Sequence, residues 1–515
     1  MTAFVGVFRA HGPTETDRAR LAAAARGLGL PGSPTTPRLG WLVHGAGPGA
    51  SAADAAGAPA AGDPVVARPL DGAAVYVARG ADGACGVSTS ARAAAAAAGR
   101  PLALDPAGFS GLLWRGAALD HRLPWRDIVA VPAGGAAVAR ADGLGCVVNT
   151  PAAPAPDAAP LDRALADVVA GPDFALLTRG GPASLALLAV RRLFGAPECD
   201  AFSVRWPRAE EARVREAGRT ARVLGARHHV LDLGDLDPAA ALSAWSAAVD
   251  VPSAEGFEAH LLDHALARGG VRRVATPAGG AALFGFGEPF LSLARRRRPW
   301  LDRSRAPRTV PDPFDVAAHR ELEGRALRRV PVHAAQSALA LLPAATREAL
   351  GTTGPRPPDG TARARSAVAA ASAAALAALV DRELRAPGPR TWRPFLAASW
   401  CPRVRSLPDR VRFGRPGSGG LLRRWLVRAR GWAQDAPAEG FEPTLDAWLR
   451  GPLAAWLADA LAPERLAAQG VWRTDGVARA VTAWRDRRPG WTARVVFVLA
   501  ALAAWLDRDG LRVAP

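Results

Sequence analysis

Near its start the chain alternates apolar with smaller residues and then takes on helical spacing. Residues Phe4–Phe8 fit a strand, and Thr14–Leu28 fits a helix with Thr14 as its N-cap and Gly29 near its end. Ala91–Ala98 predicts a second helix. Short apolar runs separated by glycines predict further strands at Val65–Val66, Ala74–Val77, Ile128–Val131 and Ala136–Ala139. Residues 1–150 are therefore expected to form a strand-rich α+β domain.

A change of composition marks the next boundary. Residues 151–160 contain only alanine, proline and aspartate, which predicts a linker. Beyond it, predicted strands (Phe174–Leu177, Ala201–Val204, Val230–Leu233) alternate with predicted helices (Ala164–Val169, Ala183–Phe194, Glu210–Leu224). This alternation is typical of a parallel, doubly wound sheet, and we assign it to a second domain over residues 161–515. Such sheets bind ligands at the carboxyl ends of their strands and at helix N-termini.

The C-terminal part of the chain has mostly helical spacing. A loop at Gly351–Gly360 is followed by a predicted alanine-rich helix at Ser366–Leu384. The longest apolar run, Val495–Leu506, is too short to span a bilayer and predicts a buried helix. The N-terminus has no basic-then-apolar signal pattern, so we expect a cytoplasmic protein without membrane association. The four cysteines form no CxxC pair and are expected to be buried thiols in a reducing compartment: Cys85, Cys146, Cys199 and Cys401.

Composition excludes some classes of protein. Apolar residues make up 49% of the chain and charged residues 22%, which is typical of a folded globular protein. The net charge is +18, with arginine everywhere in place of lysine. Isoleucine, asparagine, tyrosine and methionine are equally scarce, and with lysine they share AT-rich codons. The basic charge is thus largely a genomic bias, and we do not expect nucleic-acid binding from it.

Three segments, in order, resemble motifs of the asparagine synthetase family, which includes β-lactam-forming and lasso-peptide macrolactam-forming relatives. Residues 176–184 are similar to the pyrophosphate loop Ser-Gly-Gly-x-Asp-Ser that follows a strand. Residues 201–229, ending in Leu-Gly-Ala-Arg-His-His, resemble the next strand and helix with their Leu-Gly-x-x-His turn. Residues 274–285 resemble the acidic loop Gly-Asp-Gly-x-Asp-Glu-Leu-Phe-x-Gly.

Both ends of the chain extend the resemblance. Residues 437–453 are similar to the C-terminal Pro-Lys-x-Gly-Phe segment and the Trp-Leu that follows it. Residues 1–8 resemble the glutaminase start Met-Cys-Gly-Ile-x-Gly-x-Phe. The resemblance implies an Ntn-hydrolase-like N-terminal domain and an adenine-nucleotide hydrolase-like synthetase domain with a helical C-terminal region. It also implies a reaction in which ATP adenylates a carboxylate, Mg²⁺ neutralises the departing pyrophosphate and an amine displaces AMP.

The family positions for this chemistry hold other residues here. The aspartate of the pyrophosphate loop falls at Ala183, and the acidic positions of the second loop fall at Ala278, Ala281 and Ala282. The lysine falls at Ala438, and the nucleophilic cysteine at Thr2. Hard cations need oxygen ligands, so we expect ATP and Mg²⁺ not to be used efficiently. The shortened first domain fits the lasso-type branch best, because there the amine comes from the peptide.

Part of an anion site remains in the sequence. The resemblance assigns the following residues to nucleotide or anion binding: Arg179, Gly180, Gly181, Ser184, Ser203, Val204 and Gly279. Arg179 would either hold a phosphate or carboxylate, or be a surface arginine on a decayed loop. His228 and His229 match the family turn and are expected to have a structural role near the nucleotide.

Two other groups of residues have both a functional and a simple structural interpretation. His260 and His264, with Glu258 and Asp263 nearby, would place two zinc ligands on one helix face, or form an ordinary helix face. The run Arg295–Arg298 would grip an acidic peptide or a phosphate, or be a solvated helix end. Because neither motif has further ligands around it, we assign no metal site.

Two main hypotheses follow. The favoured one is a catalytically impaired asparagine synthetase-like protein that binds a peptide, a small acid or a protein partner in a specialised-metabolite pathway. The alternative is an active ATP-dependent amide synthetase or macrolactam cyclase whose metal site is rebuilt, with Glu255, Glu258 and Glu288 as candidate ligands. A third class, a lyase or transferase that uses the old site without ATP, stays open.

Overall fold

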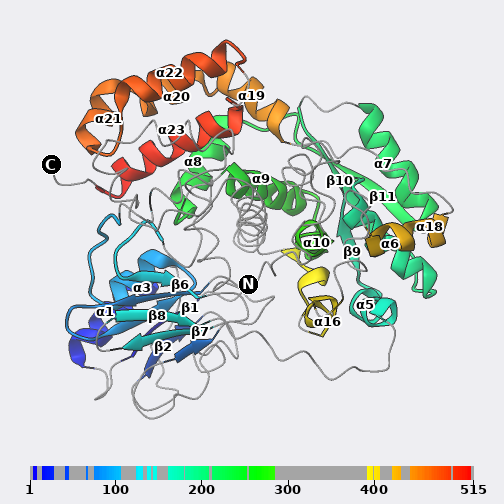
Figure 1. Cartoon of the computed structure of the whole chain (residues 1–515), viewed down its shortest axis with the longest axis horizontal. Helices are drawn as coiled ribbons and strands as arrows, with labels where there is room; N and C mark the ends of the chain where they lie inside the picture. The colour runs from blue at the N-terminus through cyan, green and yellow to red at the C-terminus, as the bar shows by residue number, and fades with distance from the viewer. Residues whose placement is uncertain are drawn as a thin grey trace, which may run out of the picture.

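A computed structural model describes residues 4–8, 14–27, 41–45, 65–67, 75–105, 109, 123–131, 136–140, 143–147, 161–178, 180–207, 211–251, 254–284, 391–397, 399–405, 407, 420–430, 441–488 and 491–511. Two regions follow each other along the described chain (Figure 1). The first is built on antiparallel strands, and the second on a parallel sheet with helices on both sides. Among the described residues, no helix has the length and apolar character that crossing a membrane requires.

The N-terminal region contains two antiparallel sheets, with the orders β2-β1-β5-β4-β6 and β3-β7-β8. Their strands are β1 (Phe4–Phe8), β2 (Trp41–Gly45), β3 (Val65–Ala67), β4 (Tyr76–Arg79), β5 (Cys85–Ser88), β6 (Ile128–Ala130), β7 (Ala136–Arg140) and β8 (Gly143–Val147). Helices α1 (Glu15–Gly27) and α3 (Ala91–Ala97) pack on the larger sheet. The predicted α+β character is confirmed, and Thr14 caps α1 by accepting the Asp17 amide at 3.2 Å.

Strands β2, β5 and β8 were not among those predicted from the sequence. Strand β5 is short and contains Gly86, which normally weakens a strand. In the structure a Cβ on Gly86 would lie 2.0 Å from the Ala94 carbonyl oxygen. The glycine therefore lets the alanine-rich helix α3 lie directly on the sheet, a contact that local sequence cannot reveal.

The second region is organised by five parallel strands in the order β11-β10-β9-β12-β13. These are β9 (Ala175–Leu177), β10 (Cys199–Arg205), β11 (Ala226–Asp232), β12 (Val274–Ala275) and β13 (Thr391–Trp392). The connecting helices are α5 (Leu161–Val169), α6 (Pro182–Leu193), α7 (Glu211–Val223), α8 (Pro238–Ala248), α9 (Ala254–Arg268) and α10 (Gly280–Phe284). This arrangement confirms the predicted parallel α/β sheet.

Strand β11 corrects one detail of the sequence prediction. The strand was expected at Val230–Leu233, after a turn that contained both histidines, whereas it begins at Ala226 and includes His228 and His229. It lies at the end of the sheet and pairs with β10, and most of its side chains are exposed or half-buried. Polar residues are common on such edge strands, and here they hid the strand pattern.

The remaining described elements are mostly helical. They are η1 (Pro394–Leu396), α16 (Cys401–Arg405), α18 (Gly420–Arg430), α19 (Glu442–Arg450), α20 (Ala454–Ala460), α21 (Pro463–Gln469), α22 (Thr474–Arg485) and α23 (Ala493–Arg508). Helix α23 is surrounded by α9 and α19 to α22, and it contains the run Val495–Leu506 that was predicted to be a buried helix. The predicted linker at 151–160 and the predicted helix at Ser366–Leu384 lie outside the described residues.

One hydrophobic core runs through both regions. It joins Trp125 and Ile128 of the N-terminal region to Trp505 and Phe497 of helix α23, and the rings of Trp125 and Trp505 lie 5.6 Å apart. A separate core fills the space between the parallel sheet, α6 and α18, where Leu187, Phe284 and Trp425 are buried. The first core shows that the N-terminal region is packed against the C-terminal helices rather than tethered by a linker alone.

Candidate functional site

The parallel sheet itself marks one place for a ligand. The chain winds outward from β9 to β10 and β11, and then returns to place β12 on the other side of β9. At such a reversal the loops after the two central strands diverge and leave a crevice at their carboxyl ends. Those loops are residues 178–181 and 276–279, which belong to the first and third motifs of the sequence analysis. Topology and motif resemblance thus point to the same edge of the sheet.

The first loop is a tight turn that opens directly into helix α6. Gly180 has a φ of 77°, which other residues adopt only with strain, and Gly181 is the N-cap of the helix. Pro182 occupies the first helical position, where its missing N–H costs nothing. The amides of Ala183 and Ser184 belong to the first turn, where no intrahelical acceptor exists, and the helix dipole favours an anion there.

A series of hydrogen-bonded hydroxyl groups holds the backbone of this loop. The Thr178 side chain is fully buried, and its Oγ1 accepts the Gly180 amide at 3.1 Å and contacts Ser184 Oγ at 2.9 Å. Ser184 Oγ donates in turn to the Gly181 carbonyl at 2.9 Å. Since each hydroxyl has one proton, Thr178 must donate to Ser184. Ser203 Oγ of β10 donates to the Thr178 carbonyl at 3.0 Å.

His228 completes this hydrogen-bonded chain. Its Nε2 lies 2.9 Å from Ser203 Oγ, across the pairing of β11 with β10. The burial of the ring, with Arg222 and His229 nearby, lowers the pKa of His228 below its ordinary value, which favours the neutral ring. His229 is exposed, contacts Asp200 at 2.9 Å and stacks on Phe202. The two neighbouring histidines therefore have different surroundings.

The second loop leads into helix α10, which begins close to the start of helix α6. Gly279 has a φ of 85°, and a Cβ there would lie 2.5 Å from Leu396. A Cβ on Gly280 would lie 2.8 Å from the Cβ of Ala183 and 3.0 Å from the Phe395 ring. Helices α6 and α10 thus meet at their N-termini through a glycine and an alanine.

Neither loop contributes a carboxylate. Ala183 and Ala278 are partly exposed methyl groups where the family motifs have acids. Ala281 and Ala282 lie on helix α10, and their side chains are outside the described part of the structure. Thr2, Arg179 and Ala438 also lie outside the described residues, so their roles stay predictions.

Of the three glutamates proposed as replacement metal ligands, the structure describes the side chain of Glu258. Glu258 is 6% exposed, and its carboxylate receives a hydrogen bond from Arg494 of helix α23 at 2.9 Å. Arg494 also pairs with Glu442 at 3.0 Å. The Glu258 carboxylate is therefore part of an ion-pair network between helices. At the carboxyl ends of β10 and β11, Arg205 pairs with Glu211 and Asp232. The side chain of Glu255 and all of Glu288 lie outside the described residues.

The remaining sequence candidates have the following positions. His260 and His264 both lie on helix α9, and burial lowers the pKa of His260. In the described residues, no group of three potential metal-ligating side chains is found. Val204 of β10 packs on the apolar cores. The prediction of buried thiols is confirmed for Cys85, Cys199 and Cys401, whereas the side chain of Cys146 and the run Arg295–Arg298 are not described.

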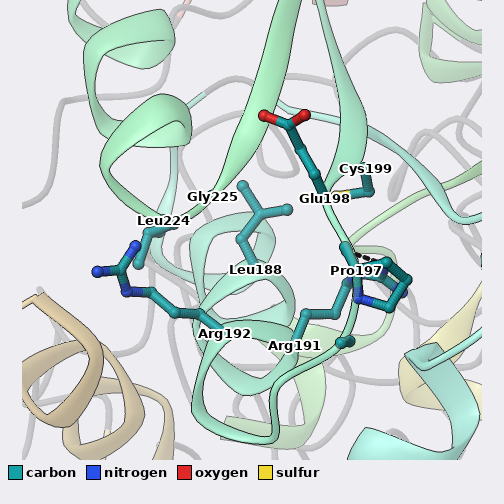
Figure 2. Close-up of a pocket in the computed structure, with 9 residues that line it drawn as sticks. Leu188, Arg191, Arg192, Pro197, Glu198, Cys199, Leu224 and Gly225 are labelled. Carbon is teal, nitrogen blue, oxygen red and sulfur yellow. Dashed lines mark hydrogen bonds between the residues drawn. The ribbon is translucent and has the colours of Figure 1, made fainter.

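A pocket of about 250 Å³ lies at the opposite end of the sheet (Figure 2). It is lined near the start of β10 and the ends of α6 and α7 by residues that include Arg191, Arg192, Glu198 and Cys199. The Arg191 guanidinium is buried over the Phe174 ring and donates to the carbonyls of Gly171 and Pro197. Arg191 thus joins three segments, and the pocket is remote from the carboxyl ends of the strands.

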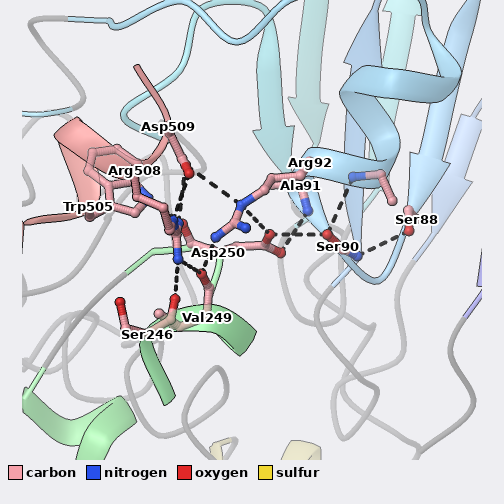
Figure 3. A network of polar contacts seen from close by, with 11 residues as sticks. Ser88, Ser90, Ala91, Arg92, Ser246, Val249, Asp250, Trp505, Arg508 and Asp509 are labelled. Carbon is pink, nitrogen blue, oxygen red and sulfur yellow. Dashed lines mark hydrogen bonds and ion pairs between the residues drawn. The ribbon is translucent and has the colours of Figure 1, made fainter. Parts of the chain in front are cut away.

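A second polar network joins the N-terminal region to the C-terminal helices (Figure 3). The carboxylate of Asp250 accepts hydrogen bonds from Ser90 Oγ at 3.0 Å and from the Ala91 amide at 2.9 Å. Arg92 lies 3.5 Å from Asp250 and 3.6 Å from Asp509, and it donates to the Val249 carbonyl. Burial raises the pKa of Asp250, against the opposing effect of these donors. Here the start of helix α3 holds a carboxylate from the other region.

Comparison with known proteins decides the ancestry of the chain. The family model described as asparagine synthase matches residues 175–507, more than half of the chain. The chain belongs to the asparagine synthase family. The match begins at strand β9 and includes both switch-point loops, as the resemblance of the motifs predicted. A search of curated proteins gives no significant match.

Sequence reasoning missed one central residue of this site. Thr178 was noted within the first motif but not as a site residue, although its hydroxyl and carbonyl organise the loop. A signal existed, since Thr178 is a polar residue directly after an apolar strand, and Ser203 is a polar residue inside one. Their connection to His228, however, depends on the pairing of strands and not on spacing along the chain.

Proposed function

We propose that this asparagine synthase family member binds an anionic ligand at its switch-point loops and does not catalyse efficient Mg²⁺- and ATP-dependent amide formation. The observation that supports the proposal is the close approach of helices α6 and α10 at Ala183 and Gly280, beside two loop motifs that contain no carboxylate. The scaffold for a phosphate or carboxylate is present, whereas the oxygen ligands for a divalent cation are missing from both motifs.

The chemistry of acyl-adenylate formation explains why this loss matters. Pyrophosphate departs with several negative charges, and Mg²⁺ held by carboxylates normally neutralises them. Losing those ligands removes several kcal/mol of transition-state stabilisation, or several powers of ten in rate. Arginine supplies positive charge but no acid–base function near neutral pH, and the chain contains no lysine.

The ligand follows from the groups that the crevice offers. Backbone amides at the start of α6 and the glycine turns on either side favour a carboxylate or phosphate group. A peptide, a small acid or a protein partner that presents such a group fits this chemistry, and by family analogy we place it in a specialised-metabolite pathway. The N-terminal region, proposed as a degenerate Ntn-like domain over residues 1–150, then has a structural rather than a glutaminase role.

The test is isothermal calorimetry with ATP, AMP and pyrophosphate, with and without Mg²⁺, together with ATP–pyrophosphate exchange in the presence of candidate acids. We expect measurable anion binding that Mg²⁺ does not strengthen, and no exchange above background. Robust Mg²⁺-dependent exchange would overturn the proposal and support the alternative of an active amide synthetase with a rebuilt metal site. The absence of any anion binding would overturn it as well.

A gain-of-function variant sharpens this test. Ala183→Asp restores a carboxylate next to the Gly280 contact, and Ala183→Asn adds the same bulk without charge. If missing metal ligands limit the site, Ala183→Asp gains an Mg²⁺-dependent increase in ATP affinity of about threefold to tenfold, since a charged contact contributes roughly 1 kcal/mol. Equal behaviour of the two variants would show that charge at this position does not limit cation binding.

A further inference from the structure

The hydrogen bonds beneath the anion loop have one consistent direction. Ser203 Oγ gives its proton to the Thr178 carbonyl, so it can only accept at its contact with His228 Nε2. His228 must therefore carry a proton on Nε2. On the same principle, the Thr178 hydroxyl donates to Ser184, which donates to the Gly181 carbonyl. Every step of this series has one donor and one acceptor.

The environment of the imidazole ring favours the neutral form with the proton on Nε2. A Cβ on Gly218 of helix α7 would lie 2.5 Å from His228 Nδ1, so the ring packs directly against the backbone of that helix. Burial lowers the pKa of His228, and the neighbouring Arg222 and His229 act in the same direction. The glycine in α7 makes room for the ring, and the lowered pKa favours its uncharged form.

We propose that His228 is a positioning residue for the anion loop: its Nε2 proton orients Ser203, and Ser203 fixes the Thr178 carbonyl beneath helix α6. This inference rests on the proposed function of the loop as an anion site. Strand pairing carries the effect from β11 through β10 to the end of β9. With Thr178 fixed, its hydroxyl holds the Gly180 amide inward, and the amides at the start of α6 remain directed at a ligand.

The experiment compares pyrophosphate binding by calorimetry in three variants. His228→Leu removes the donor, whereas His228→Gln keeps an N–H near the position of Nε2. His229→Leu, one residue further along the same strand, is the matched control because its ring is exposed and contacts Asp200 instead. We expect His228→Leu to weaken pyrophosphate binding about tenfold, and His228→Gln and His229→Leu to stay within about threefold of the parent protein.

A second measurement does not depend on ligand binding. Hydrogen exchange of the Gly180 amide reports the bond to Thr178 Oγ1, and ¹⁵N NMR reports which nitrogen of His228 carries the proton. We expect faster Gly180 exchange, about tenfold, in His228→Leu only, and a neutral ring with the proton on Nε2 in the parent protein.

The two readouts separate two failures. Unchanged Gly180 exchange in His228→Leu, or a proton on Nδ1, would overturn the positioning role even if pyrophosphate binds. If the parent protein binds no pyrophosphate but exchange and tautomer follow expectation, the proposed function fails and the positioning of the loop by His228 stands. A similar loss of pyrophosphate affinity in His229→Leu would assign the effect to the strand as a whole and overturn the specific role of His228.

Discussion

Two polar networks of this protein differ in the kind of group that builds them. The network at Asp250 joins the two regions with carboxylates and arginines, each balanced by an opposite charge or a helix amide (Figure 3). The network at Thr178 holds the switch-point loop with neutral hydroxyls, carbonyls and one neutral imidazole. The chain thus joins its regions through partly buried charged groups, whereas no charged side chain is among the described ones that shape its candidate site.

The difference explains what each network is suited to do. Buried charges stay together only when both signs are present, so removing one partner is costly and the junction is specific. Neutral hydroxyl chains fix geometry without attracting or repelling an ionic ligand. A loop of the second kind has its backbone turn fixed before helix α6 by uncharged partners among its described residues.

The largest effect is expected at the junction between the two regions. Asp250→Ala leaves Arg92 without one of its two carboxylate neighbours and Ser90 and the Ala91 amide without an acceptor. We expect a loss of about 3 kcal/mol in the free energy of unfolding, measured by urea denaturation. As a control, Asp235→Ala breaks an exposed pair with Arg268 and should leave the urea midpoint unchanged. Equal midpoints for the two variants would mean that the junction contributes nothing special.

A second prediction concerns the contact between the loops. Gly280→Ala places a methyl group 2.8 Å from the Ala183 Cβ and 3.0 Å from the Phe395 ring, so the helices α6 and α10 must separate. We expect a destabilisation of about 1–3 kcal/mol and weaker binding of pyrophosphate. Gly171→Ala is the matched control, because a Cβ there meets nothing within 4 Å. Unimpaired stability and binding in Gly280→Ala would show that the two loops need not touch.

The third prediction concerns the centre of the hydroxyl chain. Thr178→Val keeps the shape of the side chain but leaves Gly180 and Ser184 without their partner in a fully buried place. We expect a loss of about 1–2 kcal/mol in the free energy of unfolding, read from thermal and urea unfolding. Thr482→Val removes an exposed hydroxyl that bonds to its own helix and should be neutral by comparison. If both variants have the same stability, the hydrogen bonds of the Thr178 hydroxyl do not stabilise the loop.

The smallest effect is expected from pH. Because the pKa of His228 is lower in the folded protein than its ordinary value near 6.5, the unfolded chain binds a proton more readily in that range. The contribution of His228 to stability should therefore be constant above about pH 7.5 and fall as the pH drops through the ordinary value. His228→Gln should reduce this fall without abolishing it, because the pKa of His260 is lowered as well. An identical pH profile of unfolding in parent and variant would contradict the assignment.

Local patterns predicted much of the scaffold. The strand at Phe4–Phe8, the capped helix after Thr14 and the buried helix over Val495–Leu506 were all predicted from spacing and capping chemistry. The alternation of strands and helices from Phe174 onward predicted the parallel sheet, and two of the motifs lie at the carboxyl ends of its central strands. These features depend on neighbours along the chain, which the sequence displays directly.

Other features could not be predicted, because they depend on segments far apart in the sequence. Strand β5 was missed because Gly86 interrupts its apolar pattern. A glycine is needed there because the Ala94 carbonyl of helix α3 leaves no room for a side chain. Glu258 looked like a free candidate for a rebuilt metal site until helix α23 brought Arg494 to it. His228 looked like part of a turn until strand pairing placed it beside Ser203.

The amino-acid sequence by itself determined the family scaffold and the absence of carboxylates from the two loop motifs, because both can be recognised from short continuous segments. Only the tertiary structure decided that helices α6 and α10 meet at Ala183 and Gly280, that uncharged hydrogen-bond partners hold the first loop, and that Glu258 is paired with Arg494. The physical reason is that hydrogen-bond partners and close contacts are set by strand order and helix packing, which bring together residues 25 or more positions apart.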